Sequence, residues 1–564
     1  MRRTLFWYVF KDLLRIFFLT SGALAGIMSF GGLLRPLTEN GLDVKQVMAI
    51  LRYSMPAMTT YSLPIAALFA TTVVYGRLAA DNEITAMRAA GIGYNPFTGI
   101  ASPALWLGLS ISLLSLLLLC FIVPVFMLKV ERVIFSNVGQ IICNEIAKNH
   151  QLKFNQGDMD VTVYSHAATM EPADSKNPNL QVVTLVSPMV VTYQSVNKKN
   201  EDKPKIPKDF FMSSFANISI ERNEKTDEIY VNVQANGTKF PRNFAGGEQM
   251  GVSSGAVMGL TYPSPVRENT KFMDIFRLRY LLKDPSDSRR VKEVLRGFIR
   301  ADQQGTYLED LLNDLNKDGE VKLASETEAF TLERGNAAGA INRDHTQVNL
   351  TSPAGQRDIR FDQAKGNVHV DSGKARFTVV PDADKQRLGV SITLEDAMVK
   401  VGTDEVASPR DAFRRDINLP MPDGIETIEN RTLADYTKAG SILPDRQRQL
   451  YRVGLQLTNS ITSELHSRIS FALSCLVLVL VGCMLGMLFR SGNFLTAFAV
   501  SVVPALISIA LIITGQHTCE NIPQAHQLTA NFTNPLNLGL TLIWTGNAAV
   551  AAIAVLLWAK LKAQ

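Results

Sequence analysis

Six apolar runs of about 20 residues, three near each end of the chain, constrain its fold more than any other feature. They cover residues 13–34, 55–75, 98–126, 469–489, 494–515 and 538–557. A helix of about 20 apolar residues crosses roughly 30 Å of hydrocarbon. The sequence therefore predicts six transmembrane helices in two groups of three, separated by the polar region 144–445.

The basic residues of the short connecting segments indicate how these helices are oriented. The segments on one side of the predicted membrane carry Arg2, Arg3, Lys11, Arg15, Arg77, Arg88, Arg490, Lys560 and Lys562. Those on the other side carry Arg35, Lys45 and Arg52. Basic residues concentrate in cytoplasmic loops, so both termini are predicted to be cytoplasmic and region 144–445 to lie outside.

Region 144–445 contains stretches in which apolar and polar residues alternate. Examples are "VTVYSH", "EIYVNVQANG" and "LGVSITLEDAMVKVG". Such a period of two is typical of half-buried antiparallel strands. We therefore expect a large, mainly β domain between the third and fourth helices.

Several function classes find no support in the residues. The net charge is +5, but the basic residues are scattered, so nucleic-acid binding is not indicated. No GxxxxGK[ST] or HExxH motif occurs, and we predict neither a catalytic site nor a cofactor. Three interpretations stay open: a transport permease, an envelope anchor or scaffold whose outer domain binds proteins, and a membrane-bound lipid-modifying enzyme.

One stretch, "DLNKDGEVKLAS", begins like a calcium-binding loop. Asp314, Asn316 and Asp318 have the expected offsets, but Ser325 occupies the twelfth position. That position normally supplies a bidentate glutamate. The stretch is a weak calcium candidate, with an ordinary acidic turn as the alternative, and we predict no other metal site.

The charged stretch "RLAADNEITAMRAAG" lies between the second and third apolar runs. It predicts a cytoplasmic helix over residues 82–90, capped by Asp81 or Asn82 and stopped by Gly91. Ile84 and Met87 lie along one stripe of this helix. It is suited either to a groove on a soluble partner, oriented by Glu83, or to the lipid headgroups.

Three cations stand where anionic lipid headgroups are expected. Arg35 follows the first run, and Lys129 and Arg132 follow the third. They can pair with phosphates, or they can be ordinary snorkelling side chains at the membrane interface. In the first run Gly22 and Gly26 form a GxxxG pair, which we expect to pack within one subunit.

Three motifs carry a resemblance to a known family. "NEITAMRAAGI", "SELHSRISFALSCLVLVLVGCMLGMLFRSG" and "TGNAAVAAIAVLLWAK" resemble the LptF/LptG (YjgP/YjgQ) permeases of the lipopolysaccharide-export ABC transporter. The resemblance implies a multi-pass protein of the bacterial inner membrane, with a jelly-roll-like periplasmic domain inserted between helices 3 and 4. Family outer domains are shorter, so we expect an extra strand-rich insertion at about 301–444.

The resemblance also implies domain bounds, partners and site residues. The expected domains are 1–143, with a coupling helix at 82–90, then 144–445 and 446–564. A cytoplasmic LptB-like ATPase would dock on the coupling helix through Glu83, with Ile84, Met87 and Arg88 beside it. A second permease subunit, identical or paralogous, a periplasmic LptC/LptA-like bridge protein, membrane lipids and lipopolysaccharide are the other expected partners.

In this family basic residues at the outer end of the first helix contact the substrate, which supports Arg35. Glu464, His466 and Arg468 match the family's "ELH" signature before the fourth run. They either relay motion between the outer domain and the membrane or form plain interfacial hydrogen bonds.

Overall fold

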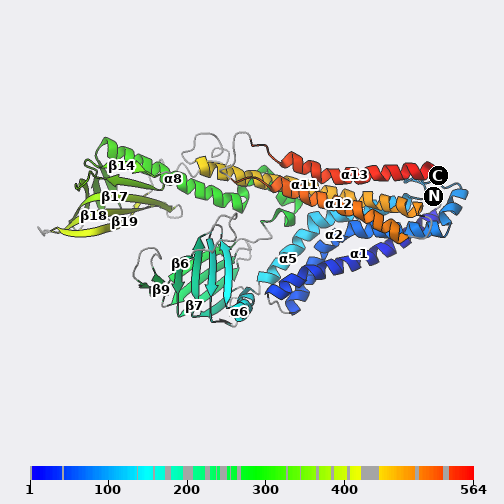
Figure 1. Ribbon diagram of the computed structural model, residues 1–564, viewed down its shortest axis with the longest axis horizontal. Helices are drawn as coiled ribbons and strands as arrows, with labels where there is room; N and C mark the ends of the chain where they lie inside the picture. The colour runs from blue at the N-terminus through cyan, green and yellow to red at the C-terminus, as the bar shows by residue number, and fades with distance from the viewer. Residues whose placement is uncertain are drawn as a thin grey trace. The chain divides into compact units, whose positions relative to one another are not determined.

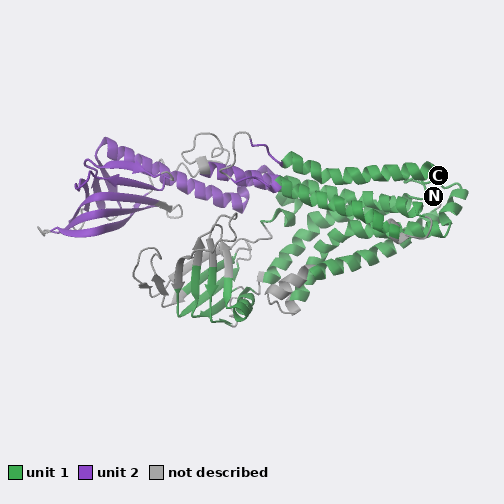
Figure 2. Cartoon of the chain, viewed as in Figure 1, with its two compact units in different colours: residues 1–280, 460–519, 536–564 green, residues 281–459, 520–535 purple. Residues whose placement is uncertain are grey.

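The structure is a computed structural model, in which the chain forms two compact units (Figures 1 and 2). Unit 1 contains residues 1–280, 460–519 and 536–564, and unit 2 contains residues 281–459 and 520–535. The structure describes residues 3–563, apart from 41–43, 136–137, 157–158, 172–179, 195–206, 223–228, 237, 242–249, 254–255, 263–267, 326–327, 343–344, 364–366, 383–386, 403–406, 421–443, 490–493 and 525–531.

Within this described part, six helical segments are long and apolar enough to cross a membrane, which confirms the predicted number. The third one is α4, continued through the π-helical turn η1 into α5. The elements are α1 (Arg3–Asn40), α2 (Val44–Ala80), α4 (Ser102–Leu117), η1 (Leu118–Ile122), α5 (Val123–Phe135), α11 (Pro444–Leu488), α12 (Phe494–Glu520) and α13 (Leu536–Ala563).

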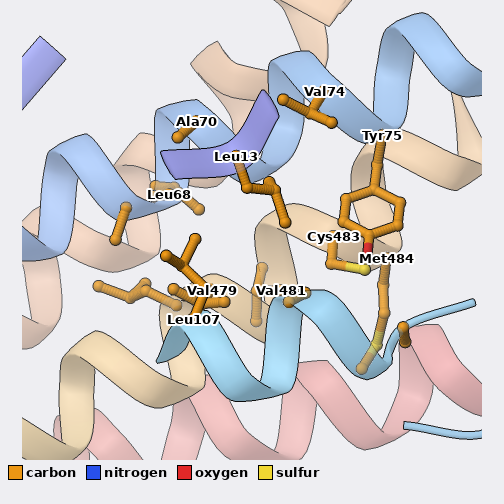
Figure 3. Packing of buried hydrophobic residues seen from close by; sticks show 14 of the residues in the cluster. Leu13, Leu68, Ala70, Val74, Tyr75, Leu107, Val479, Val481, Cys483 and Met484 are labelled. Carbon is orange, nitrogen blue, oxygen red and sulfur yellow. The ribbon is translucent and has the colours of Figure 1, made fainter. Parts of the chain in front are cut away.

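Helices α2 and α11 form the interior of the transmembrane bundle. Their spans are 72% buried, whereas the first, fifth and sixth spans are each 28% buried. Side chains from α1, α2, α4 and α11 interdigitate there, among them Leu13, Leu68, Tyr75, Leu107 and Val479 (Figure 3). The outer helices therefore keep a large apolar surface for lipid or for another subunit.

Small residues set how closely the helices approach one another. A Cβ added to Gly482 of α11 would stand 2.8 Å from the Leu68 carbonyl oxygen, and one on Gly486 2.8 Å from that of Thr72. Only glycine fits such contacts. Among the described residues, no atom lies within 4 Å of the corresponding positions on Gly22 and Gly26, so the expectation that this GxxxG pair packs inside the subunit is wrong.

Unit 1 also contains a strand-rich domain after α6 (Val138–Asn149), built from two antiparallel sheets. The first sheet has the order β1-β2-β5-β6-β9-β10, and the second β11-β8-β7-β4-β3. Their bounds are β1 (Gln151–Gln156), β2 (Met159–Tyr164), β3 (Ala167–Met170), β4 (Leu180–Val186), β5 (Met189–Gln194), β6 (Pro207–Met212), β7 (Phe215–Arg222), β8 (Ile229–Asn236), β9 (Thr238–Pro241), β10 (Met250–Ser253) and β11 (Ala256–Tyr262).

The alternation of apolar residues explains the core of this domain. Every second residue of β4 is buried, and in β7 Ala216, Ile218 and Ile220 are buried at the same period. Val183 and Leu185 pack with Ile218, Ile220 and Ile146 of α6. The mainly β character is confirmed, and the jelly-roll topology stays a prediction.

Unit 2 packs one long helix, α8 (Arg289–Lys317), on one face of an eight-stranded antiparallel sheet. Phe298, Leu308 and Leu315 of the helix share a buried cluster with Phe361 and Phe377 of the sheet. The strands are β12 (Glu320–Ala324), β13 (Ala329–Glu333), β14 (Ala338–Ile341), β15 (Gln347–Thr351), β16 (Ile359–Gln363), β17 (Val368–Asp382), β18 (Arg387–Val401) and β19 (Ser408–Pro420).

Among the described residues, three short helices lie between β11 and α8. They are η3 (Thr270–Phe272), α7 (Ile275–Lys283) and η4 (Pro285–Asp287). The domain bounds expected from the sequence, including the insertion at 301–444, stay a prediction.

Candidate functional site

The helix predicted between the second and third spans is present as α3 (Glu83–Ala89). Its end is the predicted one. Gly91 has φ +82°, the Gly91 N–H donates to the Arg88 carbonyl oxygen at 2.9 Å, and the Ile92 N–H donates to that of Met87 at 3.0 Å. This pair of bonds is a Schellman motif, in which glycine avoids the strain of a left-handed residue.

The start of α3 differs from the expected side-chain cap. Asn82 has φ +58° and its side chain makes no capping hydrogen bond, while its carbonyl oxygen accepts from the Ala86 N–H at 3.0 Å. Asparagine tolerates the left-handed region better than most residues. Asn82 therefore forms the sharp turn from α2 into α3 through its backbone conformation, and its side chain does not cap the helix.

The apolar stripe of α3 faces the bundle. Ile84 is 4% and Met87 6% exposed, and both belong to the buried cluster that includes Leu78 and Ile100. The predicted orientation of this stripe toward a soluble partner is thus corrected, because the neighbouring helices already bury it. Glu83 is half-buried at the first turn, and Arg88 is exposed, its Cζ 4.9 Å from the centre of the Tyr94 ring.

Two contacts at this end of the bundle fix the chain on either side of α3. Arg77, near the end of α2, forms an ion pair with Asp12 of α1. Tyr75 donates from its hydroxyl to the Ile100 carbonyl oxygen at 3.0 Å, just before α4. Because α3 is joined to α2 by a two-residue turn and held by its own buried residues, a displacement of α3 must move α2.

The predicted headgroup cations lie near the other ends of their spans. Lys129 is exposed, and its Nζ lies 5.8 Å from the centre of the Tyr53 ring and 5.3 Å from that of Phe126. Arg132 is also exposed. Arg35 lies in α1, but its side chain is outside the described residues. Tyr53, Phe126 and Lys129 have the composition of an interfacial aromatic belt.

The calcium candidate does not have the geometry of a loop. Asp314 and Asn316 lie in the last turns of α8, and the Asp318 N–H donates to the Asp314 carbonyl oxygen at 2.8 Å. Helical residues two positions apart point to different sides, so the three side chains do not converge. Arg334 donates to the Asn316 side chain, and burial together with the Asp314 carboxylate raises the pKa of Asp310.

Across the described residues, no group of three or more His, Cys, Asp or Glu side chains is placed to hold a metal ion. The weak calcium candidate is therefore not supported by the geometry of its residues.

A buried ion pair in α11 is the most developed polar contact of the bundle. Arg468 Nε donates to Glu464 Oε1 at 2.9 Å, and the two side chains are 2% and 8% exposed. Gln516 of α12 donates to Glu464 Oε2 at 2.8 Å. A buried charge is tolerated when it is paired and hydrogen-bonded, and here both conditions are met.

Arg468 also holds the segment that precedes α7. Its Nη2 donates to the carbonyl oxygens of Thr270 at 3.3 Å, Lys271 at 3.2 Å and Met273 at 2.8 Å. The Thr270 and Ser460 hydroxyls lie 2.8 Å apart. The sequence singles out Glu464 and Arg468, which are one helical turn apart. Their spacing does not indicate a contact with residues 270–273.

His466, the third member of the sequence signature, has a different partner. Trp544 of α13 donates from its indole nitrogen to His466 Nδ1 at 3.2 Å. One turn further into the bundle, Asn547 donates to the Ser470 carbonyl oxygen at 2.7 Å. These bonds tie α11 to α13.

Comparison with known families decides the identity of the chain. The family described as "Lipopolysaccharide export system permease LptF/LptG" matches residues 7–179 and 382–560, which is more than half of the sequence. The chain belongs to the LptF/LptG family. A comparison with curated individual proteins finds no match. As an LptF/LptG protein with six apolar spans, it is a multi-pass inner-membrane permease of lipopolysaccharide export, and the family acts in transport.

The match leaves out residues 180–381. This part holds most strands of the first sheet domain and, in unit 2, α8 with strands β12 to β16. The matched residues thus comprise the spans together with β1 to β3 and with β18 and β19.

Proposed function

We propose that this LptF/LptG chain is one permease subunit of an ATP-driven exporter. It takes lipopolysaccharide, or a related glycolipid, from the inner membrane and passes it to a periplasmic bridge protein. A separate LptB-like cytoplasmic ATPase supplies the energy, and a second permease subunit, identical or paralogous, completes the transport cavity. Both termini and α3 lie in the cytoplasm, and the region 144–445 lies in the periplasm.

The packing of α3 against the bundle is the observation that supports this proposal best. Ile84 and Met87 fasten the helix to the bundle, whereas Glu83 and the exposed Arg88 remain at the surface. A partner that contacts Glu83 therefore acts on α2 through the buried contacts of Ile84 and Met87. In this proposal Glu83 provides the contact with the ATPase, and Ile84 and Met87 transmit its motion.

The energy requirement also favours an external ATPase. Removing a lipid from the bilayer costs about 0.8 kcal/mol per buried CH₂ group, so several acyl chains together cost tens of kcal/mol. The sequence has no nucleotide-binding P-loop. Lys129 and Arg132, exposed in α5 near the end of the third span, are suited to bind substrate phosphates while the acyl chains move, and Arg35 is proposed for the same role.

Copurification tests the coupling role of Glu83. The tagged chain is coexpressed with the ATPase, and Glu83→Ala is expected to remove most of the ATPase from the purified complex. Asp81→Ala is the matched control, because Asp81 is an exposed acid two residues away. An unchanged yield for Glu83→Ala, or an equal loss for both variants, would contradict the proposal and favour an envelope anchor.

Substrate retention tests the cations. Lys129→Glu combined with Arg132→Glu is expected to lower the lipopolysaccharide that copurifies with the assembled complex. Lys148→Glu, at an exposed lysine of α6, is the control. Equal retention by all variants would reassign Lys129 and Arg132 to anchoring at the interface.

A further inference from the structure

The segment 269–280 packs against the third span at a definite depth. The rings of Phe276 in α7 and Phe121 in the π-helical turn of that span lie with their centres 6.1 Å apart. Phe121 comes nineteen residues after Ser102, where α4 begins. At 1.5 Å per residue the separation is about 28 Å, close to the roughly 30 Å thickness of the hydrocarbon.

Phe121 is thus at the border of the hydrocarbon, at the end of the span away from α3. The aromatic residues Tyr53 and Phe126 and the cation Lys129 lie at or beyond the same border, and their rings and ammonium group are in contact. Phe276, packed on Phe121, lies at the level of this belt or slightly deeper. The segment before α7 therefore returns to the membrane surface before the fourth span begins.

The contacts of Arg468 explain how the single 3₁₀ turn of η3 and the extended Met273 after it are tolerated there. Backbone carbonyls that lack partners are costly near hydrocarbon because little water can replace the missing bonds. Arg468 satisfies the carbonyl oxygens of Thr270, Lys271 and Met273 at 3.3 Å or less. Its charge is balanced by Glu464, so the segment is seated by a neutral, buried pair.

The exposed side of α7 has the chemistry of a lipid interface. Leu278 is fully buried, whereas Phe276 is 71% and Tyr280 50% exposed. Phe276 and Tyr280 are one turn apart and share a face. Arg279 is exposed beside them, and the Arg277 Cζ lies 5.4 Å from the centre of the Tyr280 ring. Aromatic side chains combined with arginine are typical of residues at the headgroup layer.

We propose that α7 is an interfacial helix that inserts into the headgroup layer of the bilayer. Phe276 and Tyr280 enter the boundary between headgroups and acyl chains, and Arg277 and Arg279 bind lipid phosphates. The exposed face of Phe276 is continuous with the exposed face of Phe121 on the span, which favours lipid as the occupant over a soluble protein. The role does not depend on ATP or on the contact at Glu83.

Photocrosslinking tests this assignment on the full chain. The protein carries p-benzoylphenylalanine at position 276 and is reconstituted in nanodiscs of phosphatidylethanolamine and phosphatidylglycerol. We expect lipid adducts at this position and few or none from the same probe at position 215. Phe215 is the matched control, because it is a phenylalanine of β7 that is 53% exposed. A probe at Tyr280 serves as the second position if the first variant does not fold.

Charge reversal tests the arginines. Arg279→Glu is expected to lower the yield of phosphatidylglycerol adducts from the probe at position 276 by about fivefold or more, because losing one basic residue at an anionic surface already gives about this factor and the new carboxylate repels the lipid. Lys148→Glu should leave it unchanged. Adducts to a second copy of the chain at positions 276 and 280, or no lipid adduct at either, would overturn the proposal. The proposed transport function would survive that result, since it is tested at Glu83.

Discussion

The two short helices beside the transmembrane bundle, α3 and α7, differ in how they are held and in what they expose. The first is held by two buried apolar side chains, Ile84 and Met87, and exposes small and polar residues. The second follows a turn held by a buried arginine and exposes Phe276 and Tyr280. The difference indicates that the exposed face, more than the helix itself, determines the kind of partner.

Each mode of attachment fits its proposed surroundings. Apolar packing holds α3 without using its charged groups, which stay available to a soluble protein in water. Hydrogen bonds from Arg468 hold the chain before α7 where carbonyl groups would otherwise lack partners. The same bundle thus holds α3 in a way that suits an aqueous partner, and holds α7 in a way that suits lipid.

The largest expected effect comes from removing the buried cation. Arg468→Met leaves Glu464 charged without its partner and removes the hydrogen bonds from Arg468 to the carbonyl oxygens of Lys271 and Met273. Breaking a buried pair on one side costs about 3 to 5 kcal/mol. We expect a loss of this size in the free energy of unfolding, measured by titration with sodium dodecyl sulfate in mixed micelles.

Two further variants make this result specific. Arg446→Met removes an exposed arginine of the same helix and should change stability little. Adding Glu464→Leu to Arg468→Met removes the unpaired charge and should restore part of the loss. If the double variant were as unstable as the single one, the carbonyl contacts alone would account for the role of Arg468.

The second largest effect is expected from removing one of the buried apolar side chains that hold α3. Met87→Ala leaves a cavity under α3, where the side chain is 6% exposed, and cavities of this kind cost about 2 to 3 kcal/mol. Hydrogen exchange should become faster at Glu83–Ala89 while α2 stays protected. Thr85→Ala, at an exposed position of the same helix, is the control. Equal exchange in both variants would show that α3 is held by something other than its buried stripe.

The sequence predicted the spans and the end of α3, but not what buries the stripe of α3 or which glycines make the close helix contacts. The length of the apolar runs was enough to predict six spans, and Gly91 was enough to predict the end of α3. The stripe of Ile84 and Met87 shows that one face of α3 must be buried, but either a partner or the bundle can bury it. Likewise, Gly22 and Gly26 permit a close contact without requiring one, and the contact occurs at Gly482 and Gly486.

The contacts of Arg468 could not be inferred from local patterns. Its acceptors are backbone carbonyl oxygens of residues up to 198 positions away, and a carbonyl leaves no mark in the residue types. A pair of opposite charges one turn apart is also common on solvated helices. Only the three-dimensional arrangement separates the buried pair from an exposed one.

A smaller effect tests the end of α3. Gly91 has φ +82°, where any residue with a Cβ is strained by about 1 to 2 kcal/mol. Gly91→Ala is therefore expected to lower the stability of the α3 region, seen as faster hydrogen exchange at Ile92 than in the wild type. Gly93 has open space around its Cβ position and is not among the residues with positive φ. Gly93→Ala is thus the control that should have no such effect.

The smallest effect sharpens the contrast between buried and exposed charges. Arg77 and Asp12 form an ion pair at the α3 end of the bundle, with side chains 48% and 29% exposed. Exposed pairs contribute about 0 to 1 kcal/mol. A double-mutant cycle with Arg77→Gln and Asp12→Asn should give a coupling energy in this range, which falls in 1 M salt because the charges are screened. A coupling energy as large as that expected for Arg468 and Glu464 would mean that the Arg77–Asp12 ion pair also stabilises the fold. In that case α3 is held by charge as well as by apolar packing.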